Sequence, residues 1–212
     1  MKNILCFGDS NTWGFIPLTG ERLPRELRWT GLLQKALGDD YYVIEAGLNS
    51  RTVAFDDPIQ PDRNGLKSAR MLIMQAQPLD MIIVMLGSND TKNYLGQNSC
   101  SVTKAMDLLL KNISSYYYEE KLPRPAILLA APIDISDHIS SLPTGTEFDE
   151  KSVKIIREIR DTYRELALQH DCKYIDAGQY ASPSPLDGLH MTTEGHAAFA
   201  LAVEKKVRQM LG

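Results

Sequence analysis

The sequence predicts an α/β fold in which a parallel sheet of about five strands lies between two layers of helices. Two observations predict it. Short apolar runs alternate along the chain with longer amphipathic segments, and most of the short runs are apolar nearly throughout. Strands covered by helices on both faces have this composition, because neither face meets water. A chain of 212 residues is long enough to bury such a core, and we expect a single domain over residues 1–212.

Each element of this fold is indicated by its local pattern. Apolar runs bounded by turn residues predict five strands, over Asn3–Phe7, Tyr42–Ala46, Met81–Leu86, Ala126–Ala130 and Lys173–Asp176. Apolar residues spaced three and four apart predict the helices between them, over Trp29–Leu37, Leu66–Gln75, Val102–Tyr118, the stripe from Val153 to Leu166, and Thr193–Leu211. Thr192 or Thr193 is expected to cap the last helix, because a threonine oxygen accepts from free backbone N–H groups.

Three long irregular segments interrupt this pattern, and each follows an expected strand. They are rich in Pro, Gly and Asp, and they cover Phe15–Arg28, Thr52–Asn64 and Asp134–Phe148. In a doubly wound sheet, loops beyond the carboxyl ends of the strands form the ligand site. We therefore treat all three segments as candidate pocket walls, with an ordinary surface loop as an equal alternative for each.

Composition argues against several functional classes. The formal net charge of −4 leaves no basic surplus for a nucleic-acid interface. No apolar run is long enough to cross a membrane, and the run after Met1 is too short for an export signal. The three cysteines are far apart and show no metal-ligand spacing. We expect a cytoplasmic protein without a metal or an organic cofactor.

Four short segments at or after the expected strand ends carry polar residues suited to chemistry. Because parallel strands end at one edge of the sheet, we expect all four segments to meet there. In chain order they are Gly8-Asp9-Ser10-Asn11, Gly47-Leu48-Asn49-Ser50, Gly87-Ser88-Asn89-Asp90 and Asp187-Gly188-Leu189-His190.

Ser10 is the candidate nucleophile among these residues. A serine hydroxyl is a weak nucleophile and needs an adjacent base, for which His190 is the best placed histidine. Asp187 lies three residues before His190, so a turn can place its carboxylate on one imidazole nitrogen and leave the other facing Ser10. The three residues together predict a nucleophile, a base and a residue that orients the base.

The other three histidines are weaker candidates for the base. His170 lies at the polar end of a helix, and His196 falls in the first turn of the last helix, where packing or surface placement is expected. His138 lies in the long loop after the fourth strand, where an ordinary loop residue is a better interpretation than a substrate contact.

Acyl transfer also requires donors for the negative charge that develops on the carbonyl oxygen. The expected donors are the backbone N–H groups of Ser10 and Gly47 and the side-chain amide of Asn89. Trp13 and Asn49 are further candidates for the pocket.

These segments resemble the conserved blocks of the GDSL/SGNH hydrolase superfamily. The run Phe7–Asn11 is similar to its first block, Gly47 to the glycine of the second, Gly87–Asp90 to the third, and Asp187-x-x-His190 to the fifth. The resemblance implies a flavodoxin-like three-layer α/β/α sandwich and the same triad, with Ser10, Gly47 and Asn89 as oxyanion donors. The absence of a Gly-x-Ser-x-Gly motif agrees, because the common α/β-hydrolase fold needs one.

Further segments resemble the aryl esterase and acyltransferase branch of this superfamily. They are Arg28–Gly31, Ile44–Thr52 and Met85–Lys92. The resemblance implies hydrolysis of small acetyl or aryl esters through an acyl-enzyme, acyl transfer to other acceptors, and a homo-oligomer. A carbohydrate O-acetyl esterase of the same superfamily is the alternative.

Two unrelated functions are weaker alternatives. A metal-dependent phosphoesterase would need four side chains to converge on a metal ion, namely Asp9, Asp90, Asp187 and His190. Their spacing matches no known ligand motif. A non-catalytic flavodoxin-like binding module would need a glycine-rich phosphate loop, and the first loop has only Gly8 and Gly14.

Overall fold

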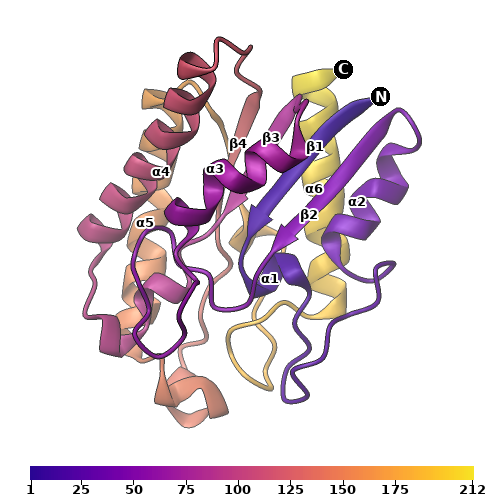
Figure 1. The fold of residues 1–212 in the computed structure, drawn as a ribbon. Coiled ribbons are helices and arrows are strands. Elements are labelled where there is room, and N and C mark those ends of the chain that lie inside the picture. Colours follow the sequence, from indigo (N-terminus) through magenta and orange to yellow (C-terminus); the bar gives the residue numbers. More distant parts are fainter.

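A single sheet of five parallel strands organises the molecule. The computed structural model describes every residue from Met1 to Gly212. The strand order is β2-β1-β3-β4-β5, and helices cover both faces of the sheet (Figure 1). The strands are β1 (Lys2–Gly8), β2 (Tyr41–Gly47), β3 (Met81–Met85), β4 (Ala126–Ala131) and β5 (Lys173–Asp176). The predicted α/β fold class is confirmed, and each expected strand is present with its ends moved by one residue at most.

Two helices cover one face of the sheet and three cover the other. Contacts join α2 to α6 on the first face, and α4 to both α3 and α5 on the second (Figure 1). The helices are α1 (Ser10–Trp13), α2 (Trp29–Leu37), α3 (Gly65–Ala76), α4 (Ser99–Glu119), α5 (Glu150–Gln169) and α6 (Thr193–Leu211). Five short 3₁₀ helices lie in the loops, as η1 (Asn89–Thr91), η2 (Asn93–Leu95), η3 (Ile139–Ser141), η4 (Pro143–Thr146) and η5 (Ala177–Gln179).

Each strand contributes side chains to both cores, which explains the nearly continuous apolar runs. In β1, Leu5 and Phe7 lie in the core under α3, α4 and α5, whereas Ile4 and Cys6 lie in the core under α2 and α6. Alternate side chains of a strand point to opposite faces, so a strand buried on both faces must be apolar at every position.

Helices α4 and α5 begin three residues earlier than the apolar spacing indicates. Asn98 caps α4 and Asp149 caps α5, each through a capping box with a serine three residues on. A capping box satisfies backbone N–H groups at the start of a helix, and these polar first turns carry no apolar periodicity. Thr192 caps α6 through the backbone N–H of Gly195, as expected.

The chain reverses its direction of travel across the sheet at β1. From β1 it passes to β2 on one side, and then back to β3 on the other. Open α/β sheets bind ligands at the carboxyl ends of the strands at such a switch point. Helix α1 follows β1 directly at this point (Figure 1). No helix of the structure combines the length and the apolar character that a membrane crossing demands.

Candidate active site

Ser10 is the first residue of α1, directly beyond the end of β1. The preceding residue, Asp9, caps this short helix by accepting from the backbone N–H of Asn11 at 3.0 Å. Gly8 allows the tight turn, because a Cβ atom there would lie 2.0 Å from the Thr12 hydroxyl oxygen. The turn therefore holds the Ser10 side chain at the carboxyl edge of the sheet.

Asp187 and His190 form one turn that reaches Ser10 from the loop before α6. The Asp187 Oδ1 atom accepts from the backbone N–H groups of Leu189 and His190 at 3.0 and 3.1 Å. Its Oδ2 atom lies 2.6 Å from His190 Nδ1, and His190 Nε2 lies 2.9 Å from the Ser10 hydroxyl oxygen. Two consecutive hydrogen bonds thus join the three side chains, which we call the serine cluster.

Two residues that sequence reasoning missed hold this cluster together. Asn11 accepts from the backbone N–H of Met191 at 2.8 Å and donates to the carbonyl of Leu189 at 3.4 Å. It therefore joins the α1 turn to the His190 turn. The Phe15 ring stacks on the imidazole of His190 with centroids 4.3 Å apart. For Asn11, the only signal in the sequence is its position next to Ser10.

The electrostatics of the pair favour an ionised Asp187. Burial raises the pKa of Asp187, but the hydrogen bond and charge of His190 and two backbone N–H groups outweigh burial. The net pKa lies below the ordinary value for an aspartate. An ionised carboxylate fixes the orientation of the imidazole and stabilises its protonated form.

Two polar groups beside Ser10 are available to bind an oxyanion. The Asn89 amide donates to the carbonyl of Arg51 at 3.2 Å, which leaves its other N–H for the pocket that it lines. The Ser50 backbone N–H makes no hydrogen bond within the protein, and Ser50 has a φ of 61°. A non-glycine residue in this left-handed region is strained, and such residues gather at functional sites.

Gly47 and Trp13, predicted at this site, lie outside the pocket lining. The Gly47 Cα faces the backbone of α1, and a Cβ atom there would lie 2.3 Å from the Trp13 nitrogen. Gly47 thus allows β2 and α1 to approach closely. Further along the same loop, Asn49 and Ser50 line the pocket.

A pocket of about 640 Å³ opens above Ser10. All three long irregular segments contribute to its walls. Phe15, Leu18, Thr19 and Gly20 come from the first, Gln60 and Arg63 from the second, and Pro143, Thr144, Thr146, Glu147 and Phe148 from the third. Only four of its 19 lining residues are hydrophobic, so most of the lining positions carry side chains that can form hydrogen bonds.

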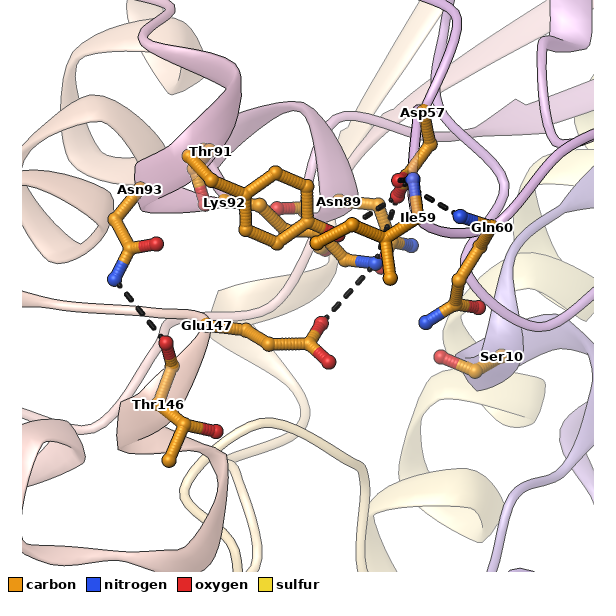
Figure 2. A network of polar contacts seen from close by, with 12 residues as sticks. Ser10, Asp57, Ile59, Gln60, Asn89, Thr91, Lys92, Asn93, Thr146 and Glu147 are labelled. Carbon is orange, nitrogen blue, oxygen red and sulfur yellow. Dashed lines mark hydrogen bonds and ion pairs between the residues drawn. The ribbon is translucent and has the colours of Figure 1, made fainter.

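A second charged cluster lies in the wall of this pocket, and sequence reasoning missed it. The Lys92 amino group lies 3.1 Å from Asp57 Oδ2 and 3.1 Å from Glu147 Oε2 (Figure 2). The Lys92 side chain is 1% exposed and that of Asp57 is fully buried, whereas Glu147 is 38% exposed. We call these three residues the lysine cluster. No local sequence motif indicates the lysine cluster, because its three residues come from loops that are far apart in the sequence.

Lys92 and Asp57 stabilise each other in their charged forms. Burial lowers the pKa of Lys92, but Tyr94, Asp57 and Glu147 outweigh burial and raise it overall. Burial raises the pKa of Asp57, yet backbone N–H groups, Lys92 and Tyr94 lower it overall. A lysine held charged in this way cannot act as a base near neutral pH.

The remaining histidines lie away from the pocket lining. His138 is exposed in its loop, and His170 Nε2 contacts Asp107 Oδ1 at 2.7 Å. His196 is buried and accepts from the Trp29 backbone N–H at 3.3 Å. Burial, with the charges of His190 and Arg28, lowers its pKa to about 4, so it remains neutral.

The acidic residues that a metal-dependent phosphoesterase would need as ligands each make other contacts in the structure. Asp9 caps α1, Asp187 faces His190, and both oxygens of Asp90 accept from the Val53 backbone N–H at 2.8 and 3.0 Å. No group of three or more His, Cys, Asp or Glu side chains is arranged to hold a metal ion. The geometry at this sheet edge is that of a serine and its base.

Comparison with known proteins agrees with this geometry. The model of the GDSL-like lipase/acylhydrolase family matches residues 6–198. The aryl esterase of M. smegmatis is 32% identical with a TM-score of 0.92, and a carbohydrate acetylesterase from Sinorhizobium meliloti is 31% identical with a TM-score of 0.93. Each alignment covers 100% of both chains. No curated protein sequence matches the chain. The chain belongs to the GDSL-like lipase/acylhydrolase family and is a carboxylic ester hydrolase.

Proposed function

We propose that the protein is a serine esterase that hydrolyses small acyl esters through a triad of Ser10, His190 and Asp187. The observation that carries the proposal is the hydrogen-bonded line of the serine cluster at the floor of an open pocket. Nucleophile, base and orienting carboxylate at these distances are the recurring arrangement for acyl transfer.

In the proposed reaction, the Ser10 hydroxyl oxygen attacks the ester carbonyl while His190 Nε2 takes its proton. When the tetrahedral intermediate collapses, His190 gives this proton to the leaving alcohol, and the acyl group remains on Ser10. Water then attacks the acyl-enzyme, with His190 accepting the proton of the water and returning one to Ser10. Asp187 stabilises the protonated imidazole in both steps.

We propose the Asn89 amide and the backbone N–H groups of Ser10 and Ser50 as the oxyanion donors. Ser50 replaces Gly47 in this role, because the Ser50 N–H is free and its residue lines the pocket, whereas Gly47 faces α1. Loss of one such donor raises the barrier of the acylation step by about 3–4 kcal/mol.

The test is the hydrolysis of p-nitrophenyl acetate by the wild type and by Ser10→Ala. We expect kcat to fall roughly 10⁴-fold or more, because the nucleophile is lost. A serine-directed phosphonate should form an adduct at Ser10, and the Asn89→Asp variant should retain that serine but lose rate. Equal rates for the wild type and Ser10→Ala, or an adduct on another serine, would contradict the proposal.

The acyl-enzyme of this mechanism also accepts an alcohol in place of water. The pocket leaves Ser10 accessible from solvent, so an alcohol can reach the acyl group. Adding methanol to the p-nitrophenyl acetate assay should then yield methyl acetate, while nitrophenol release reports the acylation step. Acetate as the only acyl product at high methanol would exclude acyl transfer.

The polar side chains in the pocket lining favour a second candidate, a carbohydrate acetyl ester. Side chains such as Asn49, Gln60 and Thr144 line the pocket and can hydrogen-bond to sugar hydroxyls, which an apolar aryl group cannot satisfy. A ratio of kcat/KM for an acetylated monosaccharide against phenyl acetate above one would support it, and a ratio far below one would reject it.

A further inference from the structure

One wall of the pocket differs from the rest in how its polar groups are used. We call it the β2–α3 wall, and it consists of Asn49, Gln60 and Arg63, all between the end of β2 and the start of α3. Elsewhere the charged pocket residues are paired within the protein: Lys92 contacts two carboxylates, and Asp187 contacts His190. The β2–α3 wall has no such pairing.

Arg63 is the unpaired cation of the pocket. Its guanidinium makes no hydrogen bond within the protein, and no carboxylate lies within ion-pair distance. Its Nε atom is enclosed and lacks a partner. An arginine side chain is always charged and presents several donors in a planar fork, so an enclosed N–H without an acceptor is costly.

The neighbouring wall residues are also unsatisfied. The Asn49 Oδ1 atom is enclosed and accepts no hydrogen bond, and Asn49 and Arg63 are the only pocket-lining residues with such an orphaned atom. The Gln60 side-chain amide has no partner in the protein either, although its backbone N–H donates to Asp57 at 3.0 Å. Figure 2 shows the Gln60 side chain extending toward Ser10 from the segment that carries Asp57.

A second arginine, Arg51, adds positive charge near Arg63. Burial lowers the pKa of Arg51 to about 10, Asp9 opposes this effect, and the charge of Arg63 adds to it. Two guanidinium groups therefore repel each other at the base of this wall. A bound anion at Arg63 would offset that repulsion.

We propose that the β2–α3 wall is a specificity site that binds a carboxylate of the substrate through Arg63. The preferred substrates are then acyl esters that carry a carboxylate on either the acyl or the alcohol part. This proposal rests on the proposed esterase function. The pocket of about 640 Å³ is larger than an acetyl group needs, so an ester bound at Ser10 can extend to this wall.

The arrangement fits a carboxylate better than a phosphate. A guanidinium fork matches the two oxygens of one carboxylate with parallel hydrogen bonds. A dianionic phosphate calls for more than one cation, and the other pocket cation, Lys92, is already held between Asp57 and Glu147. The Glu147 carboxylate in the same lining opposes the double charge of a phosphate dianion more strongly than the single charge of a carboxylate.

The experiment compares matched anionic and neutral esters. On the alcohol side, 4-acetoxybenzoate is paired with 4-acetoxybenzamide. On the acyl side, the mono-p-nitrophenyl ester of glutaric acid is paired with its neutral amide. For each pair, the ratio of kcat/KM (anionic over neutral) is measured after subtraction of the uncatalysed rate, and the pair with the higher ratio shows which part of the ester reaches Arg63.

We expect a wild-type ratio of about tenfold or more for one of the pairs, as a charge-assisted hydrogen bond provides. Arg63→Gln should bring this ratio to about one, chiefly through KM, and Arg63→Lys should retain part of it. Lys205→Gln removes an equal charge on the exposed face of α6 and should leave the ratio unchanged. The preference should also weaken as salt is added.

Two results would overturn the proposal. One is a wild-type ratio of one or less in both pairs, and the other is a ratio that Arg63→Gln does not move. Neither affects the proposed esterase function, because the neutral esters report on it independently. Failure of that function would appear instead as equal hydrolysis of the neutral esters by the wild type and Ser10→Ala.

Discussion

The two charged clusters beside the pocket are built from similar groups but arranged for opposite purposes. In the serine cluster, one carboxylate holds a histidine whose second nitrogen remains free to face Ser10. In the lysine cluster, a buried cation is held between two carboxylates, and neither carboxylate contacts Ser10 or His190. The first arrangement can pass a proton, whereas the second can only hold its charges and the loops that bear them.

The two clusters also differ in how far apart their residues lie in the sequence. The Asp187–His190 contact closes a single turn, and its carboxylate is further held by two backbone N–H groups of that turn. The lysine cluster instead joins the loop after β2, the segment after β3 and the loop after β4. We infer that the lysine cluster fixes the pocket walls around the chemistry of the serine cluster.

The largest expected effect is on activity, from a change in the serine cluster. Asp187→Asn should lower kcat for p-nitrophenyl acetate about 10⁴-fold, because an amide no longer stabilises the protonated imidazole and favours the wrong tautomer. Its free energy of unfolding should change far less, since the amide oxygen can still accept from Leu189 and His190. Steady-state kinetics and urea unfolding of the same preparation measure both. A drop in kcat below tenfold would show that Asp187 does not orient the base.

The next largest effect is on stability, from a change in the lysine cluster. Lys92→Met leaves the fully buried Asp57 carboxylate without its cation. Removing one partner of a buried ion pair typically costs about 3–5 kcal/mol, so urea unfolding should show a loss of this size.

A matched double variant separates the lost pairing from lost packing. Lys92→Met combined with Asp57→Asn removes the unpaired charge and should recover part of the stability that Lys92→Met loses. If the double variant is less stable than Lys92→Met, the lysine cluster does not stabilise through its charges.

Asp90, two residues before Lys92 and fully buried, makes the stability of the protein depend on pH. Burial raises the pKa of Asp90 from 3.8 to about 7, although the Val53 backbone N–H opposes this. Between these values the folded chain binds a proton that the unfolded chain has released, so stability falls as pH rises through this range. The wild type should therefore lose stability relative to Asp90→Asn from about pH 4 to about pH 7. A constant difference in unfolding free energy across that range would contradict the raised pKa.

The sequence predicted the parts of the site whose signals are local. Ser10 follows an apolar strand, and Asp187 precedes His190 by one turn. Both segments lie beyond strand ends, and the loop before α6 carries the His190 turn to the α1 turn, where Asn11 joins the two. The sequence predicts the second backbone donor at Gly47, because a glycine lets a ligand approach the backbone closely. The structure shows that the close approach at Gly47 is to α1, while Ser50 adopts the left-handed backbone without a glycine to mark it.

The lysine cluster and the β2–α3 wall could not be predicted in the same way. From the sequence alone, Lys92 is expected to be an ordinary surface lysine. Its burial depends on the distant loops that carry Asp57 and Glu147. Arg63 stands out because its guanidinium has no hydrogen-bond or ion-pair partner in the protein, and no local sequence pattern encodes that property. Periodicity fixes strands and helices, but the packing of long loops is a property of the whole molecule.

The smallest expected effect tests whether the two carboxylates of the lysine cluster are equivalent. Glu147 is 38% exposed, so water screens its contact with Lys92 and can solvate it when the pair is broken. Glu147→Gln should lower the free energy of unfolding by no more than about 1 kcal/mol, as for surface ion pairs. Asp57→Asn should cost clearly more, because the buried Asp57 also accepts from two backbone N–H groups and the Tyr94 hydroxyl. Urea unfolding of the two variants gives the comparison, and equal losses would mean that burial does not set the strength of these contacts.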